Sequence, residues 1–375
     1  MRQAFGAPFF ILTMIIFGKE FSKGPVITFF VFLFMVFFYY VGSQDDNQPI
    51  EYDDDPPIAV EPLNLDDDDQ EGTPTKGDGS DEKDRLANSN ITISEFEDDR
   101  DPYKELEELI GLEDVKKEVH SMASYVKVQQ ARKEKGLKTN NVSYHLVFTG
   151  NPGTGKTTVA RIMARIFKDL GIVKRGHLVE TDRSGLVGEY VGQTAPKTNA
   201  VIDKALDGVL FVDEAYALMD GNGANSYGSE AIATLLKRME DDRDRLIVII
   251  AGYTGEMKEL IESNPGLKSR FNRYIEFKDY SSEDLQRIFV NNAEKAGYTL
   301  NSEAVEVLQT RMDLAVSKRD RHFGNARYAR NVLEKAMSEQ ADRLAAEGNV
   351  NKASSEALST LTANDLTKAF NAIKQ

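Results

Sequence analysis

The sequence predicts an α/β domain with a parallel sheet, followed by a smaller helical domain. Residues 144–149 and 208–212 are short apolar runs. Residues 246–252 are continuously apolar, as in a strand that is buried on both faces. Helical patterns at residues 103–137 and 156–170 alternate with these strands, and only helical signals follow them. This order indicates a parallel sheet covered by helices and then a separate helical lid.

Capping sequences mark the helices of the C-terminal part. Ser281 is followed three residues later by Asp284, and Thr362 is followed by Asp365 at the same spacing. Such pairs satisfy the free N–H groups at a helix start. A long helical segment is expected near residues 324–346.

The loop after the first strand has a phosphate-binding sequence. Residues 150–157 read Gly-Asn-Pro-Gly-Thr-Gly-Lys-Thr, which matches G-x-x-x-x-G-K-[ST] between a strand and a helix. Glycines let backbone N–H groups face phosphates, and the helix N-terminus adds partial positive charge. We expect Lys156 to reach the β- and γ-phosphates of ATP and the Thr157 hydroxyl to bind Mg²⁺. The predicted nucleotide ligands are Gly150, Asn151, Pro152, Gly153, Thr154, Gly155, Lys156, Thr157 and Thr158.

A second strand ends in two carboxylates. Residues 208–212 are apolar and run into Asp213 and Glu214. Alone, this pattern is often a strand that enters a solvated turn. Beside a phosphate loop, it indicates a metal–phosphate site with Asp213 in the Mg²⁺ shell and Glu214 polarising the attacking water.

The negative charge of the chain is concentrated in one segment. The formal net charge is −15, and residues 45–101 carry 21 Asp/Glu residues against 4 Lys/Arg residues. The rest of the chain is close to neutral, so we expect no nucleic-acid partner, because a nucleic-acid surface needs an excess of basic residues. Cysteine is absent and the four histidines are scattered, so neither a disulfide framework nor a transition-metal site is expected.

The N-terminus contains two uncharged apolar runs, at residues 4–18 and 25–41. A helix needs about 20 apolar residues to cross a bilayer, with about 17 at the lower limit. A cleaved signal peptide or a buried core helix is the alternative. One span would place the ATP site outside by the positive-inside rule. A hairpin of both runs returns it to the cytoplasm, and we favour the hairpin because hydrolysis needs ATP.

Residues 43–101 are rich in Asp, Pro, Gly and Ser, and such a composition predicts a disordered tether. The expected organisation is therefore a membrane anchor, an acidic linker, an α/β ATPase core and a helical lid, at residues 1–42, 43–101, 102–280 and 281–375.

Over residues 102–372 the chain resembles AAA+ ATPases. More narrowly, it is similar to the CbxX/CfqX family, which includes red-type Rubisco activases and relatives of the stage V sporulation protein K. The resemblance rests on the phosphate loop, the strand end Val-Asp-Glu-Ala-Tyr and further motifs. These are Leu-Ile-Gly-Leu-Glu-Asp-Val-Lys at 109–116, Gly-Glu-Tyr-Val-Gly at 188–192, Asn-Pro-Gly-Leu-Lys-Ser-Arg-Phe at 264–271 and Phe-Gly-Asn-Ala-Arg at 323–327.

The resemblance implies roles for residues outside the phosphate loop. Ile110 and Gly111 would line the adenine pocket. Arg270 would reach the nucleotide of a neighbouring subunit, with Arg273 in reserve and a surface salt bridge as the alternative for either. Arg327 would sense the γ-phosphate from the lid, and Arg330 competes with it for that role.

Other implied roles concern the substrate and the attacking water. Tyr190, with Val191 and Gly192, would form a loop that grips a polypeptide in the central pore of a hexamer; the alternative is a tyrosine packed under the loop. A second pore loop is expected near residues 221–228. Many AAA+ proteins have an asparagine after the fourth strand, whereas this chain offers Thr254 or Tyr253.

These features together predict a membrane-tethered AAA+ ATPase that forms a ring, assembles as a hexamer and remodels a protein partner. It would lie at the cytoplasmic membrane with its ATPase domain in the cytoplasm. Two alternatives are an ATP-gated assembly scaffold that threads nothing and a chaperone of the Rubisco-activase type.

Overall fold

The computed structural model of the chain describes residues 91–96, 100–139, 143–219, 227–348 and 350–373. The predicted membrane anchor at residues 1–42 lies outside this described part. Among the described residues, no helix combines the length and apolar character that crossing a membrane requires.

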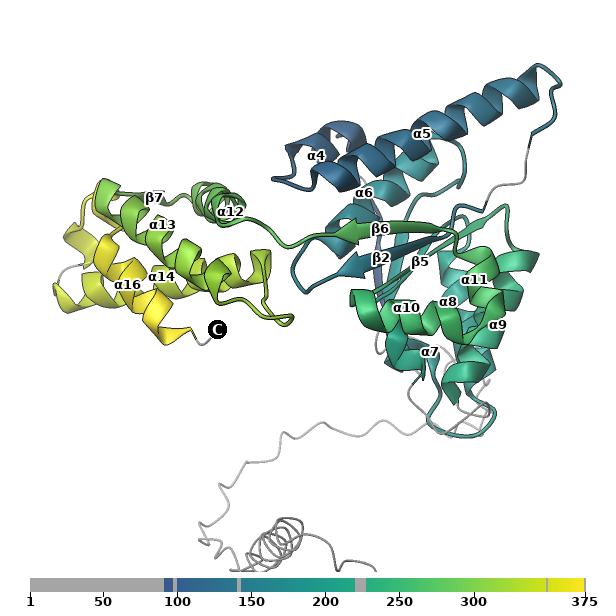
Figure 1. Ribbon diagram of the computed structural model, residues 1–375. Coiled ribbons are helices and arrows are strands. Elements are labelled where there is room, and N and C mark those ends of the chain that lie inside the picture. Colours follow the sequence, from purple (N-terminus) through teal and green to yellow (C-terminus); the bar gives the residue numbers. More distant parts are fainter. Residues whose placement is uncertain (1–90, 97–99, 140–142, 220–226, 349, 374–375) are drawn as a thin grey trace, which may run out of the picture. The chain divides into compact units, whose positions relative to one another are not determined.

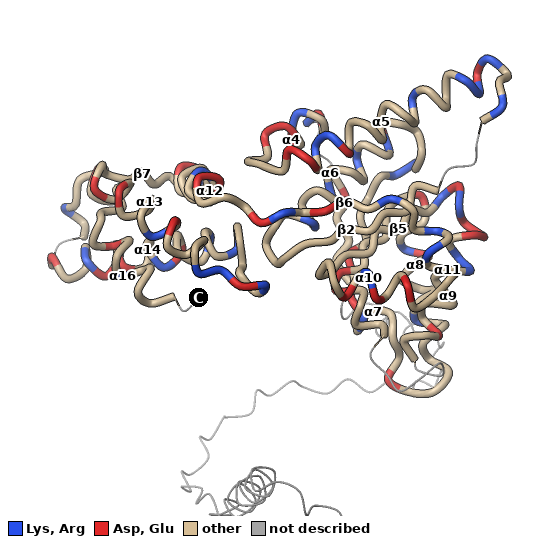
Figure 2. Tube along the Cα trace, in the orientation of Figure 1, with Lys and Arg blue, Asp and Glu red and all other residues tan. Residues whose placement is uncertain are grey.

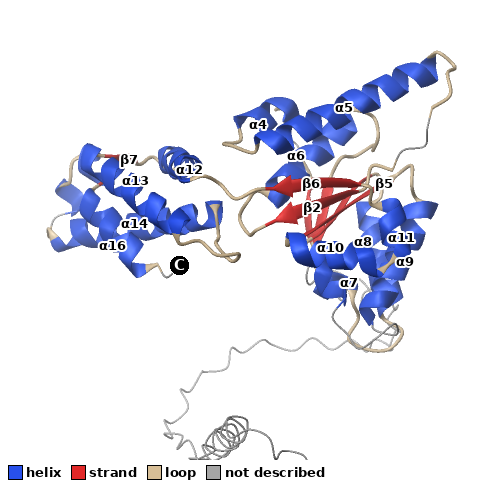
Figure 3. Ribbon diagram, viewed as in Figure 1, coloured by secondary structure: helices blue, strands red, loops and turns tan. Residues whose placement is uncertain are grey.

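The core is a six-stranded sheet in the order β1-β3-β4-β5-β2-β6. Figures 1 and 3 show its β5, β2 and β6 side by side. Neighbouring strands are parallel except for β1, which pairs antiparallel with β3. Strands β2, β4 and β5 are buried throughout, as their apolar runs predict. The strands span Thr92–Ser94 (β1), Leu146–Gly150 (β2), Leu178–Thr181 (β3), Gly208–Val212 (β4), Leu246–Gly252 (β5) and Arg273–Phe277 (β6).

Strand β1 lies within the predicted disordered linker, so that prediction is wrong for residues 92–94, whereas residues 43–90 lie outside the described part. Ile91 packs against one apolar core and Phe96 against the other. Ser94 donates a hydrogen bond to Glu180, and Arg175 forms an ion pair with Glu95 at 2.5 Å. These few apolar residues are enough to form an edge strand of the sheet. The sequence did not predict it because the acidic, polar composition of the surrounding segment indicates disorder.

Helices cover both faces of the sheet, and the side chains of each strand alternate between two apolar cores. In β2, Leu146 and Phe148 enter the core under α4–α6, whereas Val147 enters the other core. The first group of helices is α4 (Pro102–Glu108), α5 (Glu113–Glu134) and α6 (Lys156–Asp169). The second group, with one 3₁₀ helix, is α7 (Arg183–Leu186), α8 (Thr194–Ala205), η1 (Ala215–Met219), α9 (Tyr227–Asp241), α10 (Thr254–Ser263) and α11 (Pro265–Arg270).

The helix predicted over residues 103–137 is divided into α4 and α5. Gly111 and Leu112 both adopt left-handed backbone, with φ of 64° and 62°. This turn interrupts the helical hydrogen bonds and leaves residues 109–112 as a short connection.

The helical lid follows the sheet and has its own apolar core, which includes Leu285, Phe289 and Leu308. Thr362 and Asp365 form the predicted capping box. Its elements are α12 (Ser282–Lys295), β7 (Thr299–Leu300), α13 (Ser302–Ser317), α14 (Ala326–Ala346), η2 (Val350–Lys352), α15 (Ser355–Ser359), β8 (Thr360–Leu361) and α16 (Ala363–Ala372). The predicted parallel sheet, covered by helices and followed by a helical lid, is confirmed.

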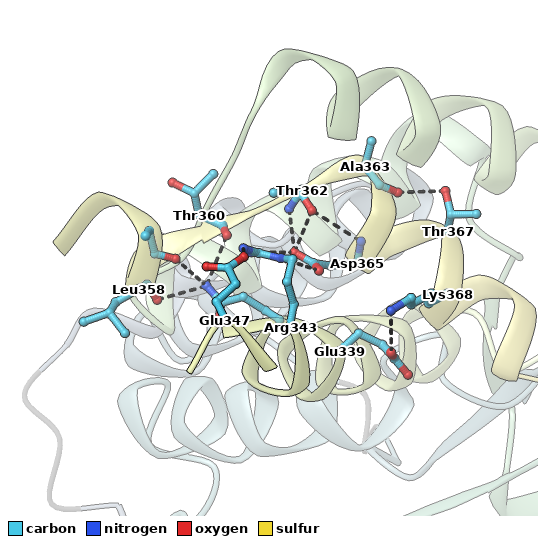
Figure 4. A network of polar contacts seen from close by, with 12 residues as sticks. Glu339, Arg343, Glu347, Leu358, Thr360, Thr362, Ala363, Asp365, Thr367 and Lys368 are labelled. Carbon is cyan, nitrogen blue, oxygen red and sulfur yellow. Dashed lines mark hydrogen bonds and ion pairs between the residues drawn. The ribbon is translucent and has the colours of Figure 1, made fainter. Parts of the chain in front are cut away.

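A buried ion pair joins α14 to α16 (Figure 4). Arg343 donates two hydrogen bonds of 3.0 Å to the carboxylate of Asp365, which is fully buried. Gln340 donates to three backbone carbonyls between Ala357 and Thr360. Burial would raise the pKa of Asp365, but hydrogen bonds from Arg343 and Thr362 outweigh it and hold the pKa below its ordinary value of 3.8.

Charges of both signs are interspersed over the described helices (Figure 2). At the end of α5, Arg132, Lys133 and Lys135 are exposed, with the acidic Glu134 among them. This distribution agrees with a near-neutral folded part.

We predict that Arg343→Met lowers the free energy of unfolding by about 2–4 kcal/mol, because Asp365 then stays buried without its partner. This expected loss of unfolding free energy is smaller than that for a fully buried pair, because the Arg343 side chain is 22% exposed. Urea unfolding followed by circular dichroism measures it. Lys335→Met on the same helix removes an i,i+4 pair and should change stability by about 0.5 kcal/mol or less.

The same pair should make the lid sensitive to acid. Since the folded pKa of Asp365 is lowered, its contribution is present above the usual pKa and disappears as the pH falls through the folded value. The Arg343→Met variant should therefore lose less stability below about pH 4 than the wild type. Equal losses in both proteins would contradict this origin.

Candidate functional site

The phosphate loop joins the C-terminal end of β2 to the first turn of α6. Three of its glycines have positive φ, namely Gly150 at 144°, Gly153 at 68° and Gly155 at 97°. A Cβ atom on Gly150 would lie 2.2 Å from the Phe277 carbonyl oxygen, so that position requires glycine. The loop therefore presents backbone to a ligand at a helix N-terminus, which suits phosphate.

Polar side chains of the loop hold its shape. The Thr154 hydroxyl is buried and donates to the Asn151 carbonyl at 2.8 Å. The Lys156 ammonium donates to the carbonyls of Gly150 and Asn151, both at 2.8 Å. Burial lowers the pKa of Lys156, against the opposing effect of nearby carboxylates. An anionic ligand would therefore be held strongly by this partly desolvated cation.

The two predicted carboxylates follow β4 directly. The backbone N–H of Asp213 donates to the Thr181 carbonyl at 2.8 Å, which fixes the strand end. Glu214 has a φ of 47° and donates its own N–H to the Asp213 carboxylate at 3.0 Å. Both carboxylates oppose the lowering of the Lys156 pKa, because their negative charges favour the protonated ammonium. The structure thus brings the acid pair and the phosphate loop together.

Thr254 and Tyr253 follow β5, the strand between β2 and β4. Thr254 is exposed at the first turn of α10. The ring of Tyr253 packs 5.9 Å from Tyr216 and 6.2 Å from His322 of the lid. Thr254 is therefore the freer of the two candidates to contact the attacking water.

A cavity of about 340 Å³ adjoins the phosphate loop. It is lined by Ile110 before the sheet, by Gly155 and Thr158 of the loop and by Ile288 of the lid. Its volume lies within the range of small-molecule sites. Gly111 lies beside it, where a Cβ atom would be 3.3 Å from the Tyr280 ring. The predicted adenine residues thus lie at a cavity of mixed polar and apolar lining next to the phosphate loop.

The lid approaches the phosphate loop through the start of α14. The backbone N–H of Ala326 donates to the Gly153 carbonyl at 3.1 Å. A Cβ atom on Gly153 would lie 2.0 Å from the Gly324 carbonyl oxygen and 3.0 Å from the Arg327 nitrogen. Arg327 is exposed on the first turn of α14, and its positive charge helps to lower the pKa of Lys156. Arg330 lines the cavity instead.

Sequence reasoning did not identify Asn325, which is fully buried beside the loop. Its side chain accepts from the Tyr280 N–H at 3.0 Å and donates to Asp279 at 2.8 Å and to the Pro152 carbonyl at 3.2 Å. The Gly-Asn pair in the motif at residues 323–327 predicts a turn. It does not indicate which residues far away in the chain the Asn325 side chain contacts.

Arg270 and Arg273 lie away from this phosphate loop. Arg273 begins β6, which runs parallel to β2, so both arginines are at the opposite end of the strands. Arg270 forms an ion pair with Glu240 at 3.3 Å, while its Nε is buried without a hydrogen-bond partner. Arg273 lies 5.4 Å from the ring of Tyr125. Neither residue can act on the nucleotide of its own chain.

The loop between α7 and α8 presents two apolar side chains to solvent. Tyr190 is 67% exposed and Val191 is 86% exposed. Hydrogen bonds close the turn beneath them, from the Gly188 N–H to Thr194 and from the Gln193 N–H to Tyr190. Gly192 has a φ of 81°. Tyr190 is therefore not packed under the loop. The second expected pore loop falls largely on residues 220–226, outside the described residues.

Comparison with known proteins agrees with this geometry. Residues 146–279 match the ATPase family associated with various cellular activities (AAA), and residues 281–375 match the AAA lid domain. Protein CbbX of Cereibacter sphaeroides is 44% identical over 261 residues, which cover 69% of this chain and 83% of that protein. Stage V sporulation protein K of Bacillus subtilis is 43% identical over 242 residues, 64% of this chain and 75% of that protein.

A longer relative and a solved structure extend the comparison. The ESX-3 secretion system protein EccA3 of Mycobacterium leprae (strain TN) is 42% identical over 279 residues. The match covers 71% of this chain but only 44% of EccA3, so this chain spans less than half of that relative. The FIGL-1 AAA domain in complex with ADP superposes with a TM-score of 0.54 at 16% identity, over 80% of this chain and 93% of that chain. This likeness shows the shared fold.

We predict that Gly153→Ala weakens nucleotide binding by about tenfold or more, because the new methyl group would separate the loop from the lid. Titration with a fluorescent ADP measures the affinity. Gly171→Ala is the matched control: its φ is 65°, but nothing lies within 4 Å of the added Cβ atom. It should cost about 1 kcal/mol of stability and leave the affinity unchanged. Equal affinities in both variants would contradict the role of this contact.

Proposed function

Because the chain belongs to the AAA family of ATPases that includes CbbX and stage V sporulation protein K, we propose that it is a membrane-tethered ring ATPase that remodels a protein partner. ATP hydrolysis follows from the family and the site. The tether, the ring and the remodelling are the proposed part. The observation that carries the proposal is the exposed Tyr190–Val191 pair on the core of an ATPase.

Different residues of the site have different proposed roles in ATP hydrolysis. Backbone N–H groups of the loop and the Lys156 ammonium bind the phosphates. Thr157 and Asp213 offer the oxygen ligands that Mg²⁺ prefers and would hold it, and the ion would neutralise phosphate charge when bound. Glu214 polarises the attacking water, which Thr254 orients, and Arg327 contacts the γ-phosphate.

We predict that Glu214→Gln lowers kcat for ATP hydrolysis by about 10²–10⁴-fold and leaves nucleotide affinity intact. Phosphate release by the full-length protein in mild detergent measures kcat. Glu262→Gln, an exposed position on α10, is the matched control and should hydrolyse ATP at the wild-type rate. Equal rates in the wild type and Glu214→Gln would remove Glu214 from the mechanism.

The position of Arg270 is consistent with assembly into a ring, and we propose that this ring is a hexamer. Arg270 lies at the end of the strands remote from its own phosphate loop, as an arginine that serves a neighbouring subunit must. Such an arginine stabilises charge on the transferred phosphoryl group. Arg273 is the reserve candidate, but its guanidinium is engaged with Tyr125.

An exposed aromatic side chain beside an exposed valine can make apolar contacts with a polypeptide whatever its sequence. We predict that Tyr190→Ala abolishes stimulation of ATP hydrolysis by permanently unfolded α-lactalbumin, while basal hydrolysis and ATP affinity stay at the wild-type level. Tyr274→Ala removes a tyrosine that is 51% exposed on β6 and should keep the stimulation. Stimulation that survives Tyr190→Ala would instead support an ATP-gated scaffold.

The membrane tether rests on the two apolar runs of the N-terminus. We predict that the full-length protein fractionates with membranes and that a variant lacking residues 1–42 is soluble and still hydrolyses ATP. Removing the anchor should also raise the protein concentration needed for assembly, because anchored copies share a small area. A full-length protein in the soluble fraction would exclude the anchor. Digestion of the ATPase domain by protease added to intact cells would exclude the cytoplasmic orientation and the hairpin.

A further inference from the structure

Asp279 lies between the sheet and the lid and contacts both. It follows the end of β6 by two residues, and its side chain is 18% exposed. Its carboxylate accepts two hydrogen bonds from the Asn151 side chain of the phosphate loop, at 2.9 and 3.0 Å. It also accepts one from Asn325 at 2.8 Å, and the Arg319 guanidinium lies 3.8 Å away. One carboxylate thus binds the nucleotide loop and two lid side chains.

Asn325 completes this connection. Besides Asp279, its amide donates to the Pro152 carbonyl of the loop and to the Phe323 carbonyl of the lid. Its backbone has φ 47° and ψ −123°, a conformation that glycine adopts much more readily. Its side-chain contacts therefore hold a strained backbone in place. That backbone leads directly into Ala326, which binds the Gly153 carbonyl, and into Arg327.

We propose that Asp279 is a positioning residue that couples the phosphate loop to the lid and so sets where Arg327 stands relative to the γ-phosphate. An ionised carboxylate only accepts hydrogen bonds, so its partners must be donors. Here the donors come from the phosphate loop and from the lid. Asn151 supplies one side and Asn325 the other. A displacement of either side breaks hydrogen bonds to a partly buried charge, which resists independent movement of loop and lid.

This coupling should distinguish ATP from ADP. Arg327 is the proposed contact of the γ-phosphate, which ADP lacks. A contact shifts an equilibrium only when it differs between the two ligands. Misplacing Arg327 should therefore weaken binding of an ATP analogue more than binding of ADP. A general loss of stability would instead weaken both equally. The inference rests on nucleotide binding at the proposed site, but not on the ring or on the polypeptide substrate.

Two variants of the full-length protein in mild detergent test the coupling. Asp279→Asn removes the charge and brings an NH₂ group against donors. Asn325→Gly removes the amide while it relaxes the positive φ, so it should fold without added strain. Titrations with fluorescent AMP-PNP and fluorescent ADP give two dissociation constants for each protein. We expect the ratio of these constants to shift against AMP-PNP by about fivefold or more in each variant.

The double variant provides a second criterion. Since both residues act through one connection, Asp279→Asn with Asn325→Gly should shift the ratio no further than either change alone. Asp365→Asn is the matched control, because it makes the same chemical change in a buried carboxylate of the lid that is remote from the loop. It should lower the melting temperature and leave the ratio at the wild-type value.

The outcomes separate the two claims. An unchanged ratio in both single variants, additive shifts in the double variant, or an equal shift in Asp365→Asn would overturn the coupling. If the wild-type protein bound neither nucleotide, the proposed function itself would fail. If the wild type bound and hydrolysed ATP while the variants behaved like it, only the coupling would be wrong.

Discussion

Three backbone segments meet at the phosphate loop, and they meet this closely because two of its positions are glycine. At Gly150 the loop lies against the carbonyl of Phe277, and at Gly153 it lies against the carbonyl of Gly324. A methyl group at either position would overlap an oxygen atom of the neighbouring backbone. Glycines in such a loop let its backbone come close to phosphate. Here they also let the end of β6 and the start of the lid lie close to the loop.

The parallel sheet supplies the remaining chemistry. Strands β4, β5 and β2 are neighbours and parallel, so their carboxyl ends lie along one edge. Asp213 and Glu214 leave β4 there, Thr254 follows β5, and the phosphate loop leaves β2. Ligands of open α/β sheets bind at this edge because chain ends of different strands converge on it. A cation, two carboxylates and a hydroxyl therefore follow the ends of neighbouring strands at the same edge of the sheet.

The sequence predicts the parts of this site that depend on local patterns. The strands were readable because β2, β4 and β5 are short buried apolar runs, and the phosphate loop has a fixed spacing. Strands β1, β3 and β6 were not predicted, since they are only three to five residues long and contain polar or charged residues. Asp279 and Asn325 were missed for a different reason. Their partners are 128 and 173 residues away in the chain, and nothing local marks such contacts.

The link between loop and lid can be measured at a single amide. The N–H of Ala326 donates to the Gly153 carbonyl, so its hydrogen exchange reports whether lid and loop are in contact. Exchange in the full-length protein should be compared with and without AMP-PNP. We expect the nucleotide to slow hydrogen exchange at Ala326 together with exchange at the amides of the phosphate loop. Protection of the loop with unchanged exchange at Ala326 would show that the nucleotide site and the lid act independently.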